Sequence, residues 1–264
     1  MAANTKIEWA TGTWNPFVGC KKISAGCKYC YMHRDQARWG KDGSEVRRTS
    51  KTTWRQLSRY KEPQRIFVCS MSDFFIQEID DWREDAWQAM RDNPQHTYMI
   101  LTKRPERIMD HLPDDWGEEG WPNVWLGISA ENQKMMDSRV SLFLDVPARV
   151  RFLSIEPLID RASLFNTYNH YELEFLFTRF ENRAEIDWII IGGESGNDQG
   201  KHRYRPCKES WIRNLLIEAD QMNIPVFVKQ MGTQLAKDLG LKDRHGRDIS
   251  EWPKDLQVRQ FPEL

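Results

Sequence analysis

Short runs of apolar residues, rich in β-branched and aromatic side chains, recur along this 264-residue chain, and most of them end in polar residues. Runs without polar alternation are typical of strands that are buried on both faces, as in a parallel sheet. The expected strands are residues 65–70, 97–102, 124–129, 151–155, 187–192 and 225–229, with a further strand near residues 6–14.

Segments with helical spacing lie between these runs. Residues 81–91 place Trp82, Ala86 and Met90 on one stripe, and residues 208–222 do the same with Trp211, Leu215, Ala219 and Met222. Strands that alternate with helices predict βαβ units and an α/β fold with a parallel sheet. We expect a partial or full α/β (TIM-like) barrel, with a doubly wound open sheet as the second architecture.

The expected domain organisation follows the same pattern. Residues 1–232 form the predicted core, residues 161–186 an insertion with its own helix, and residues 233–264 a C-terminal extension. We expect that extension to wrap one end of the barrel.

Composition excludes several classes of protein. The 38 Lys and Arg residues nearly balance 39 Asp and Glu residues, so the chain is not a uniformly basic nucleic-acid binder. A hydrophobic content of 40% is too high for a disordered chain. The mean hydropathy is −0.70 and no run of about 18 apolar residues occurs, which predicts no membrane span. The first residues lack the pattern of a signal peptide, so we expect a cytoplasmic protein.

Three of the five cysteines, Cys20, Cys27 and Cys30, fall within eleven residues. Three thiolates on one loop can hold three irons of a [4Fe–4S] cluster and leave the fourth iron open for another ligand. His33 follows Cys30 by three residues, so a closed Cys₃His zinc site is equally compatible with the spacing. Cys69 and Cys207 are expected to be small buried side chains without a ligand.

Polar residues follow most of the expected strands, and the carboxyl ends of parallel strands are where ligands gather. Helix caps account for some of them, but caps do not require Lys, Arg or Glu. The glycine turn at residues 192–196 is not a dinucleotide fingerprint. The candidate ligand-binding residues are Ser70, Ser72, Asp73, Lys103, Arg104, Ser129, Glu131, Glu156, Glu194 and Lys229.

Two resemblances add to this interpretation. Residues 27–30, CKYC, resemble the end of the radical S-adenosylmethionine (SAM) signature, although six residues separate the first two cysteines here and three usually do so. Ordered blocks over about residues 5–232 are similar to the phage gene-product thirty-seven/sixty-eight family, which is radical-SAM-like. These blocks are WNP at 14–16, GC at 19–20, SMSD at 70–73, LTKRP at 101–105, WLGISAEN at 125–132, RFLSIEP at 151–157, IGGESG at 191–196 and VKQ at 228–230.

The resemblance implies a [4Fe–4S] cluster on Cys20, Cys27 and Cys30, with SAM bound at the open iron and cleaved to a 5′-deoxyadenosyl radical. It also implies that Ser70, Ser72 and Asp73 lie near the SAM amino group. Polarity and strand order suggest Lys103 or Arg104 for the SAM carboxylate and Ser129 and Glu131 for the ribose. By position, Glu156, Glu194 and Lys229 are the candidates for substrate binding and proton transfer.

Because the family occurs in phages, the expected substrate is a hypermodified base in DNA, such as a thymidine adduct that is modified or isomerised in the host cytoplasm. The expected electron donor is a reductase of the flavodoxin or ferredoxin type. A basic stretch over residues 47–61 and another over residues 201–205 could follow phosphates. Two alternatives remain open: a zinc-stapled nucleic-acid-binding or adaptor protein without catalysis, and a radical SAM enzyme that acts on a free nucleotide or a peptide.

Overall fold

A computed structural model describes residues 5–167 and 185–263 of the chain. Its main sheet has seven strands: β1 (Gly12–Trp14), β4 (Arg65–Val68), β5 (Thr97–Thr102), β6 (Val124–Ser129), β7 (Val150–Ile155), β8 (Trp188–Gly192) and β9 (Val226–Gln230). They are ordered β1-β4-β5-β6-β7-β8-β9, and the pairs β1·β4, β4·β5, β7·β8 and β8·β9 are parallel. The predicted α/β fold with a parallel sheet is therefore confirmed.

The order of the strands decides between the two expected architectures. In a doubly wound sheet the strand order reverses at a switch point in the middle of the sheet. Here the strands follow one another across the sheet in chain order, so the doubly wound alternative is wrong. Among the residues described, β1 and β9 are the two edges of the sheet and do not pair with each other, so a full barrel is also excluded.

One expected strand is much shorter than predicted. Within residues 6–14 only Gly12–Trp14 are extended. The amide of Ala10 donates to the carbonyl oxygen of Ile7 at 3.1 Å, which closes a turn where the apolar pattern favoured a strand. A separate antiparallel pair joins β2 (Phe17–Val18) to β3 (Arg47–Arg48).

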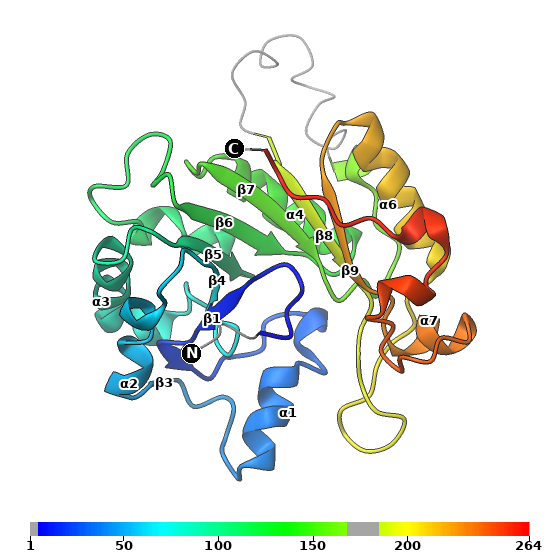
Figure 1. Cartoon of the computed structure of the whole chain (residues 1–264), viewed down its shortest axis with the longest axis horizontal. Helices are drawn as coiled ribbons and strands as arrows, with labels where there is room; N and C mark the ends of the chain where they lie inside the picture. The colour runs from blue at the N-terminus through cyan, green and yellow to red at the C-terminus, as the bar shows by residue number, and fades with distance from the viewer. Residues whose placement is uncertain (1–4, 168–184, 264) are drawn as a thin grey trace. The chain divides into compact units, whose positions relative to one another are not determined.

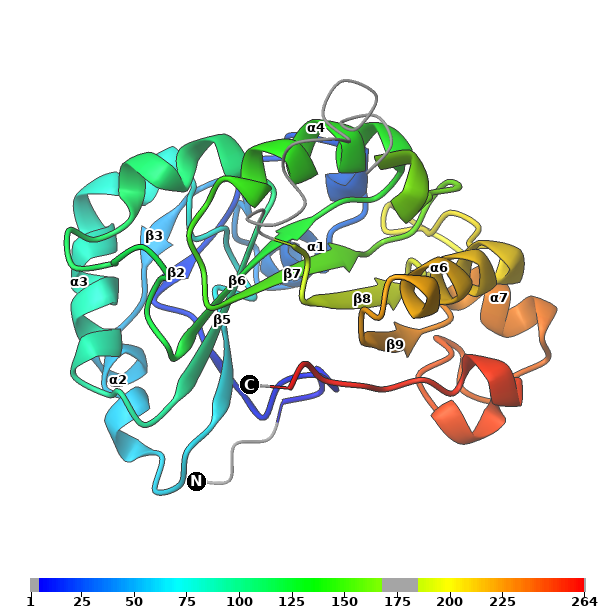
Figure 2. The same cartoon turned by 90° about the horizontal axis from the view of Figure 1, so that it is seen from above.

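The chain divides into two compact units, and the first comprises Met1–Gly127 with Val146–Val150. It contains helices α1 (Tyr31–Arg38), α2 (Lys51–Trp54) and α3 (Asp80–Arg91). Helices α2 and α3 lie on the same side of β4 and β5 (Figures 1 and 2). Helix α3 buries Ala86, Trp87 and Met90. The predicted Trp82 is instead half-buried and stacks on Phe17, with ring centroids 6.2 Å apart.

The second unit comprises Ile128–Asp145 with Arg151–Leu264 and contains α4 (Gln133–Leu144), α6 (Glu209–Gln221) and α7 (Thr233–Asp238). Helix α6 lies alongside β8 and β9 (Figure 1) and buries Ile212, Leu215 and Ala219. The predicted stripe of this helix is confirmed at Leu215 and Ala219, whereas Trp211 and Met222 are half-buried.

The chain after α7 returns along the edge of the sheet within this second unit. The amide of Val228 donates to the carbonyl oxygen of Val258, and the amide of Gln260 donates to that of Val226. These bonds occupy the open side of β9, which would otherwise present unpaired backbone groups. The core of the predicted insertion, residues 168–184, lies outside the described residues. No helix in the described ranges is long and apolar enough to cross a bilayer.

Candidate functional site

The three clustered cysteines lie on one loop of the first unit, and all three are partly exposed. The loop is anchored just before Cys20 by Gly19, which has φ of 103°, a conformation that L side chains rarely adopt. A Cβ atom at Gly19 would lie 2.1 Å from the carbonyl oxygen of Glu45, so only glycine fits. A 3₁₀ turn at Ala25–Cys27 carries the second cysteine, and Cys30 is the N-cap of α1.

Two of the predicted strand-end residues hold this loop in place. Ser72 Oγ donates to the carbonyl oxygen of Gly19 at 2.7 Å, and Ser70 Oγ donates to Asn15 Oδ1 at 3.1 Å. Tyr31, next to Cys30, donates its hydroxyl to the carbonyl oxygen of Ser70. The end of β4 is therefore tied to both ends of the cysteine loop.

Two cations from the end of β5 lie beside the thiols. Arg104 is 6% exposed, and its Nη1 lies 4.0 Å from Cys20 Sγ while its Nη2 donates to the carbonyl oxygen of Lys21 at 3.0 Å. Burial would raise the pKa of Cys27, but the Lys103 ammonium and hydrogen bonds at Ser24 and Ile23 outweigh it and lower that pKa. This environment favours thiolate at Cys27.

Cys20 has the opposite balance. Burial raises the pKa of its thiol to about 12, the Asp73 carboxylate acts in the same direction, and Arg104 opposes both. A thiolate at Cys20 therefore needs more compensating positive charge than Arg104 alone supplies. A bound metal would provide that charge.

Asp73 connects the end of β4 with the end of β5. Its carboxylate accepts four hydrogen bonds: from the Phe75 amide, Thr102 Oγ1, the Lys103 amide and Arg104 Nη1. The residue is 5% exposed. Since these donors occupy the carboxylate, Asp73 orients Lys103 and Arg104 in this structure, and a contact with the SAM ammonium remains a prediction. Sequence reasoning missed Thr102 in this network, although its place between Asp73 and Lys103 is at the same strand end.

The second unit has its own cluster of strand-end residues. Lys229 Nζ lies 2.7 Å from Glu156 Oε1, and both side chains are 18% exposed. Gln230 Nε2 donates to Glu156 Oε1 at 3.3 Å and to the carbonyl oxygen of Gly193 at 2.9 Å. Ser129 Oγ donates to the Glu156 carbonyl oxygen at 3.1 Å. The ends of β6, β7, β8 and β9 thus meet around a partly exposed ion pair.

The other two predicted glutamates of this unit are engaged by arginines that lie far from them in sequence. Glu194 is 6% exposed and receives hydrogen bonds from the backbone amide and the guanidinium of Arg205. Glu131 is 0% exposed and pairs with Arg139 of α4, at 3.1 Å between Oε2 and Nη1. Sequence reasoning missed Arg139 entirely. It placed Arg205 only in a basic stretch, because neither spacing nor composition indicates which carboxylate an arginine reaches.

No three His, Cys, Asp or Glu side chains in the described ranges are close enough together to hold a single metal ion. Thiolates around one zinc ion stand only about 3.8 Å apart, given zinc–sulfur bonds of about 2.3 Å. His33 packs against the backbone of Gly43, where a Cβ atom would lie 2.6 Å from its Nδ1. Three thiols spread over one loop beside Lys103 and Arg104 suit a larger anionic group in which each thiolate binds a different metal atom.

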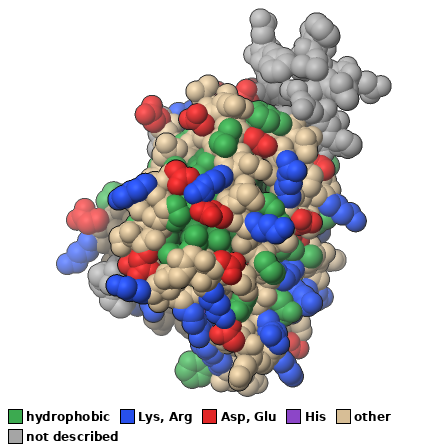
Figure 3. Space-filling view, turned by 90° about the vertical axis from the view of Figure 1, so that its right-hand side faces the viewer, with side chains coloured by type: hydrophobic (Ala, Val, Ile, Leu, Met, Phe, Trp, Pro, Cys, Tyr) green, Lys and Arg blue, Asp and Glu red, His purple; other side chains and the backbone are tan. Residues whose placement is uncertain are grey.

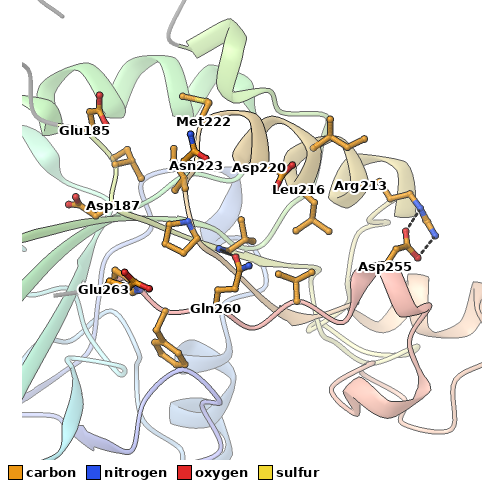
Figure 4. A pocket seen from close by; sticks show the side chains of 18 residues that line it. Glu185, Asp187, Arg213, Leu216, Asp220, Met222, Asn223, Asp255, Gln260 and Glu263 are labelled. Carbon is orange, nitrogen blue, oxygen red and sulfur yellow. Dashed lines mark hydrogen bonds and ion pairs between the residues drawn. The ribbon is translucent and has the colours of Figure 1, made fainter. Parts of the chain in front are cut away.

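A cavity of about 880 Å³ lies elsewhere in the second unit (Figure 4). It opens where β8 and β9 begin and is lined by α6 and by residues near the C-terminus, including Asp187, Asp220, Arg213 and Asp255. Arg213 and Asp255 pair with each other across it. None of the predicted site residues lines this cavity, and its carboxylates disfavour an anionic ligand. The neighbouring surface carries interspersed acidic and basic side chains (Figure 3).

Comparison with known proteins adds a family but no activity. No curated protein and no solved structure is similar enough to the chain to count as a match. One family model, described as "Protein of unknown function (DUF5131)", matches residues 4–256, which is nearly the whole chain. The chain therefore belongs to this family.

Proposed function

We propose that this protein is a radical SAM enzyme whose [4Fe–4S] cluster is held by Cys20, Cys27 and Cys30. The observation that carries the proposal is the placement of the three thiols on one loop, beside Lys103 and Arg104 at the end of a parallel strand. Three protein ligands leave one iron of such a cluster open to an exogenous ligand. The similarity to the phage gene-product thirty-seven/sixty-eight family supports the same assignment.

The cluster and SAM, when bound, supply a 5′-deoxyadenosyl radical that takes a hydrogen atom from an unactivated carbon. The residues of this chain position the reactants and exclude competing chemistry. Ser70 and Ser72 hold the cysteine loop against the end of β4. Lys103 and Arg104 balance the negative charge of three thiolates, and Asp73 orients both through its hydrogen bonds.

In the second unit, Glu156 and Lys229 are the proposed substrate-binding and proton-transfer residues. They form an ion pair that is neither fully buried nor fully exposed, so a substrate can reach it and exchange partners with it. Gly192 leaves room for the Glu156 carboxylate, because a Cβ atom there would lie 3.1 Å from Glu156 Cδ. Glu194 supports this site by fixing Arg205.

The proposed substrate is a base or base adduct in DNA. The support is a basic surface on the first unit whose side chains are exposed, and four residues contribute to it: Lys51, Arg55, Arg59 and Lys61. Arg48 contributes less, because it pairs with Asp85 at 2.7 Å and lies over the Trp54 ring. The proposed electron donor is a protein of the flavodoxin or ferredoxin type.

Anaerobic purification followed by iron, sulfide and zinc analysis tests this proposal directly. We expect about four irons and four sulfides per chain. The reduced protein should give an EPR spectrum that changes when SAM is added. Cys27→Ala should abolish iron binding, and Cys207→Ala is the matched control because Cys207 is a buried thiol in the other unit.

His33→Ala separates the cluster from the zinc alternative. A cluster on three cysteines retains its iron in this variant, whereas a Cys₃His site loses its metal. One zinc per wild-type chain without an EPR signal, together with zinc loss in His33→Ala, would overturn the proposed function. That outcome would favour the zinc-stapled binding protein.

A further inference from the structure

A buried ion pair lies directly behind the first cysteine of the loop. Arg104 Nη1 is 2.7 Å from Asp73 Oδ2, and the two side chains are 8% and 7% exposed. The same guanidinium reaches Cys20 Sγ at 4.0 Å and the carbonyl oxygen of Lys21 at 3.0 Å. The pair is therefore in contact with the backbone and the sulfur atom of the cysteine loop.

The fold alone gives little reason to keep charges at this position. Removing two charges from water costs several kcal/mol for each ion, and a well-packed apolar pair is often as stable or more stable. Other anchors already hold the loop, namely Ser72 on Gly19 and the Gly43 carbonyl oxygen on the Cys20 amide. What an apolar pair could not supply is an electric field at Cys20.

We propose that the Asp73–Arg104 pair sets the reduction potential of the cluster bound at Cys20, with Arg104 raising the potential and Asp73 lowering it. This inference rests on the proposed function. Reduction adds one electron from the donor protein to the cluster, and a nearby positive charge stabilises the added electron. An N–H group directed at a ligand sulfur acts in the same direction, whereas a carboxylate acts against it.

The test is a redox titration of the reconstituted protein, followed by EPR of the reduced state, for three variants. In Arg104→Met the ratio of reduced to oxidised cluster at the wild-type midpoint should fall at least tenfold. A tenfold fall equals a midpoint lower by about 59 mV for one electron. Asp73→Asn should shift the midpoint to higher potential. The double variant should lie between the two single variants.

Two further variants serve as controls. Arg107→Met removes a cation from the same turn, but this one pairs with Asp80, so the potential should stay close to that of the wild type. Arg104→Lys keeps the charge and should shift the midpoint less than Arg104→Met. If Arg104→Met does not fold, the double variant and Asp73→Asn still measure the two contributions, because neither leaves a buried charge opposite an apolar side chain.

The outcomes separate the two proposals. If the wild type binds a cluster and the single variants leave the midpoint unchanged, or shift it in the same direction, the inference is overturned and the proposed function stands. If the wild type binds no iron and sulfide, the proposed function fails and this inference fails with it. Opposite shifts, with the double variant between them, support the inference.

Discussion

Replacing Arg139 with methionine removes the cation from a carboxylate that has no access to solvent. Glu131 is 0% exposed, and Arg139 Nη1 lies 3.1 Å from its Oε2 and 2.6 Å from the carbonyl oxygen of Ser129. Breaking a buried pair by removing one partner costs about 3–5 kcal/mol, because the other charge stays buried. At about 2–4 °C per kcal/mol for a domain of this size, the unfolding midpoint should fall by roughly 6–20 °C.

Urea unfolding followed by far-ultraviolet circular dichroism measures this loss, with a thermal scan as the second readout. Arg213→Met is the matched control, because Arg213 pairs with Glu209 and Asp255 on the surface and such pairs contribute at most about 1 kcal/mol. The double variant Glu131→Leu/Arg139→Met should recover most of the stability. A loss in Arg139→Met no larger than in Arg213→Met would refute the reasoning that Glu131 depends on Arg139.

Other parts of the structure lead to three further predictions. Gly193→Ala should destabilise the protein by about 1–3 kcal/mol in urea unfolding, because its Cβ atom would lie 2.1 Å from the carbonyl oxygen of Met231; an unchanged midpoint contradicts this. Burial would raise the pKa of Asp80, but hydrogen bonds from Arg107 and Arg83 hold it below 3.8. Its stabilisation is therefore present above about pH 4 and is lost as the pH falls further. Asp80→Asn should lack this loss in unfolding experiments between pH 5 and pH 2, and a wild-type slope in the variant would argue against it. Neutralising the basic surface should make DNA binding less salt-dependent, by about 0.9 in the log–log slope for each phosphate that the protein no longer neutralises, as measured by fluorescence anisotropy. An unchanged slope would exclude a role in phosphate binding for the three residues replaced: Lys51→Gln, Arg55→Gln, Arg59→Gln.

The sequence predicts the sheet well where apolar runs are uninterrupted. The strands at 97–102 and 124–129 have the predicted bounds, since burial on both faces leaves an unambiguous pattern. The strand near residues 6–14 is shorter than its pattern suggests, because the turn between Ile7 and Ala10 is closed by a backbone hydrogen bond that apolar residues do not reveal. Trp82 and Trp87 on α3 are both apolar, and periodicity alone does not identify Trp87 as the one that enters the core.

The candidate site is predictable in its location but not in the division of labour among its residues. Polarity at strand ends indicates Asp73, Glu131 and Glu194, and all three lie where parallel strands end. Each of them is nearly inaccessible, and each is paired with an arginine. The arginines reach them from 8 to 31 positions away in the sequence, so no local pattern connects the partners.

Exposure then separates the residues that can meet a ligand from those that organise the site. A carboxylate such as Glu131, with no exposed surface and an arginine as its partner, holds α4 to the end of β6 and cannot reach a substrate without breaking that pair. Glu156 and Lys229 keep 18% of their side chains exposed. An ion pair of this kind is stable enough to be ordered and exposed enough to exchange its partners. In the second unit, mutagenesis for substrate binding should therefore begin with Glu156 and Lys229, whereas changes at Glu131 or Glu194 would first affect stability.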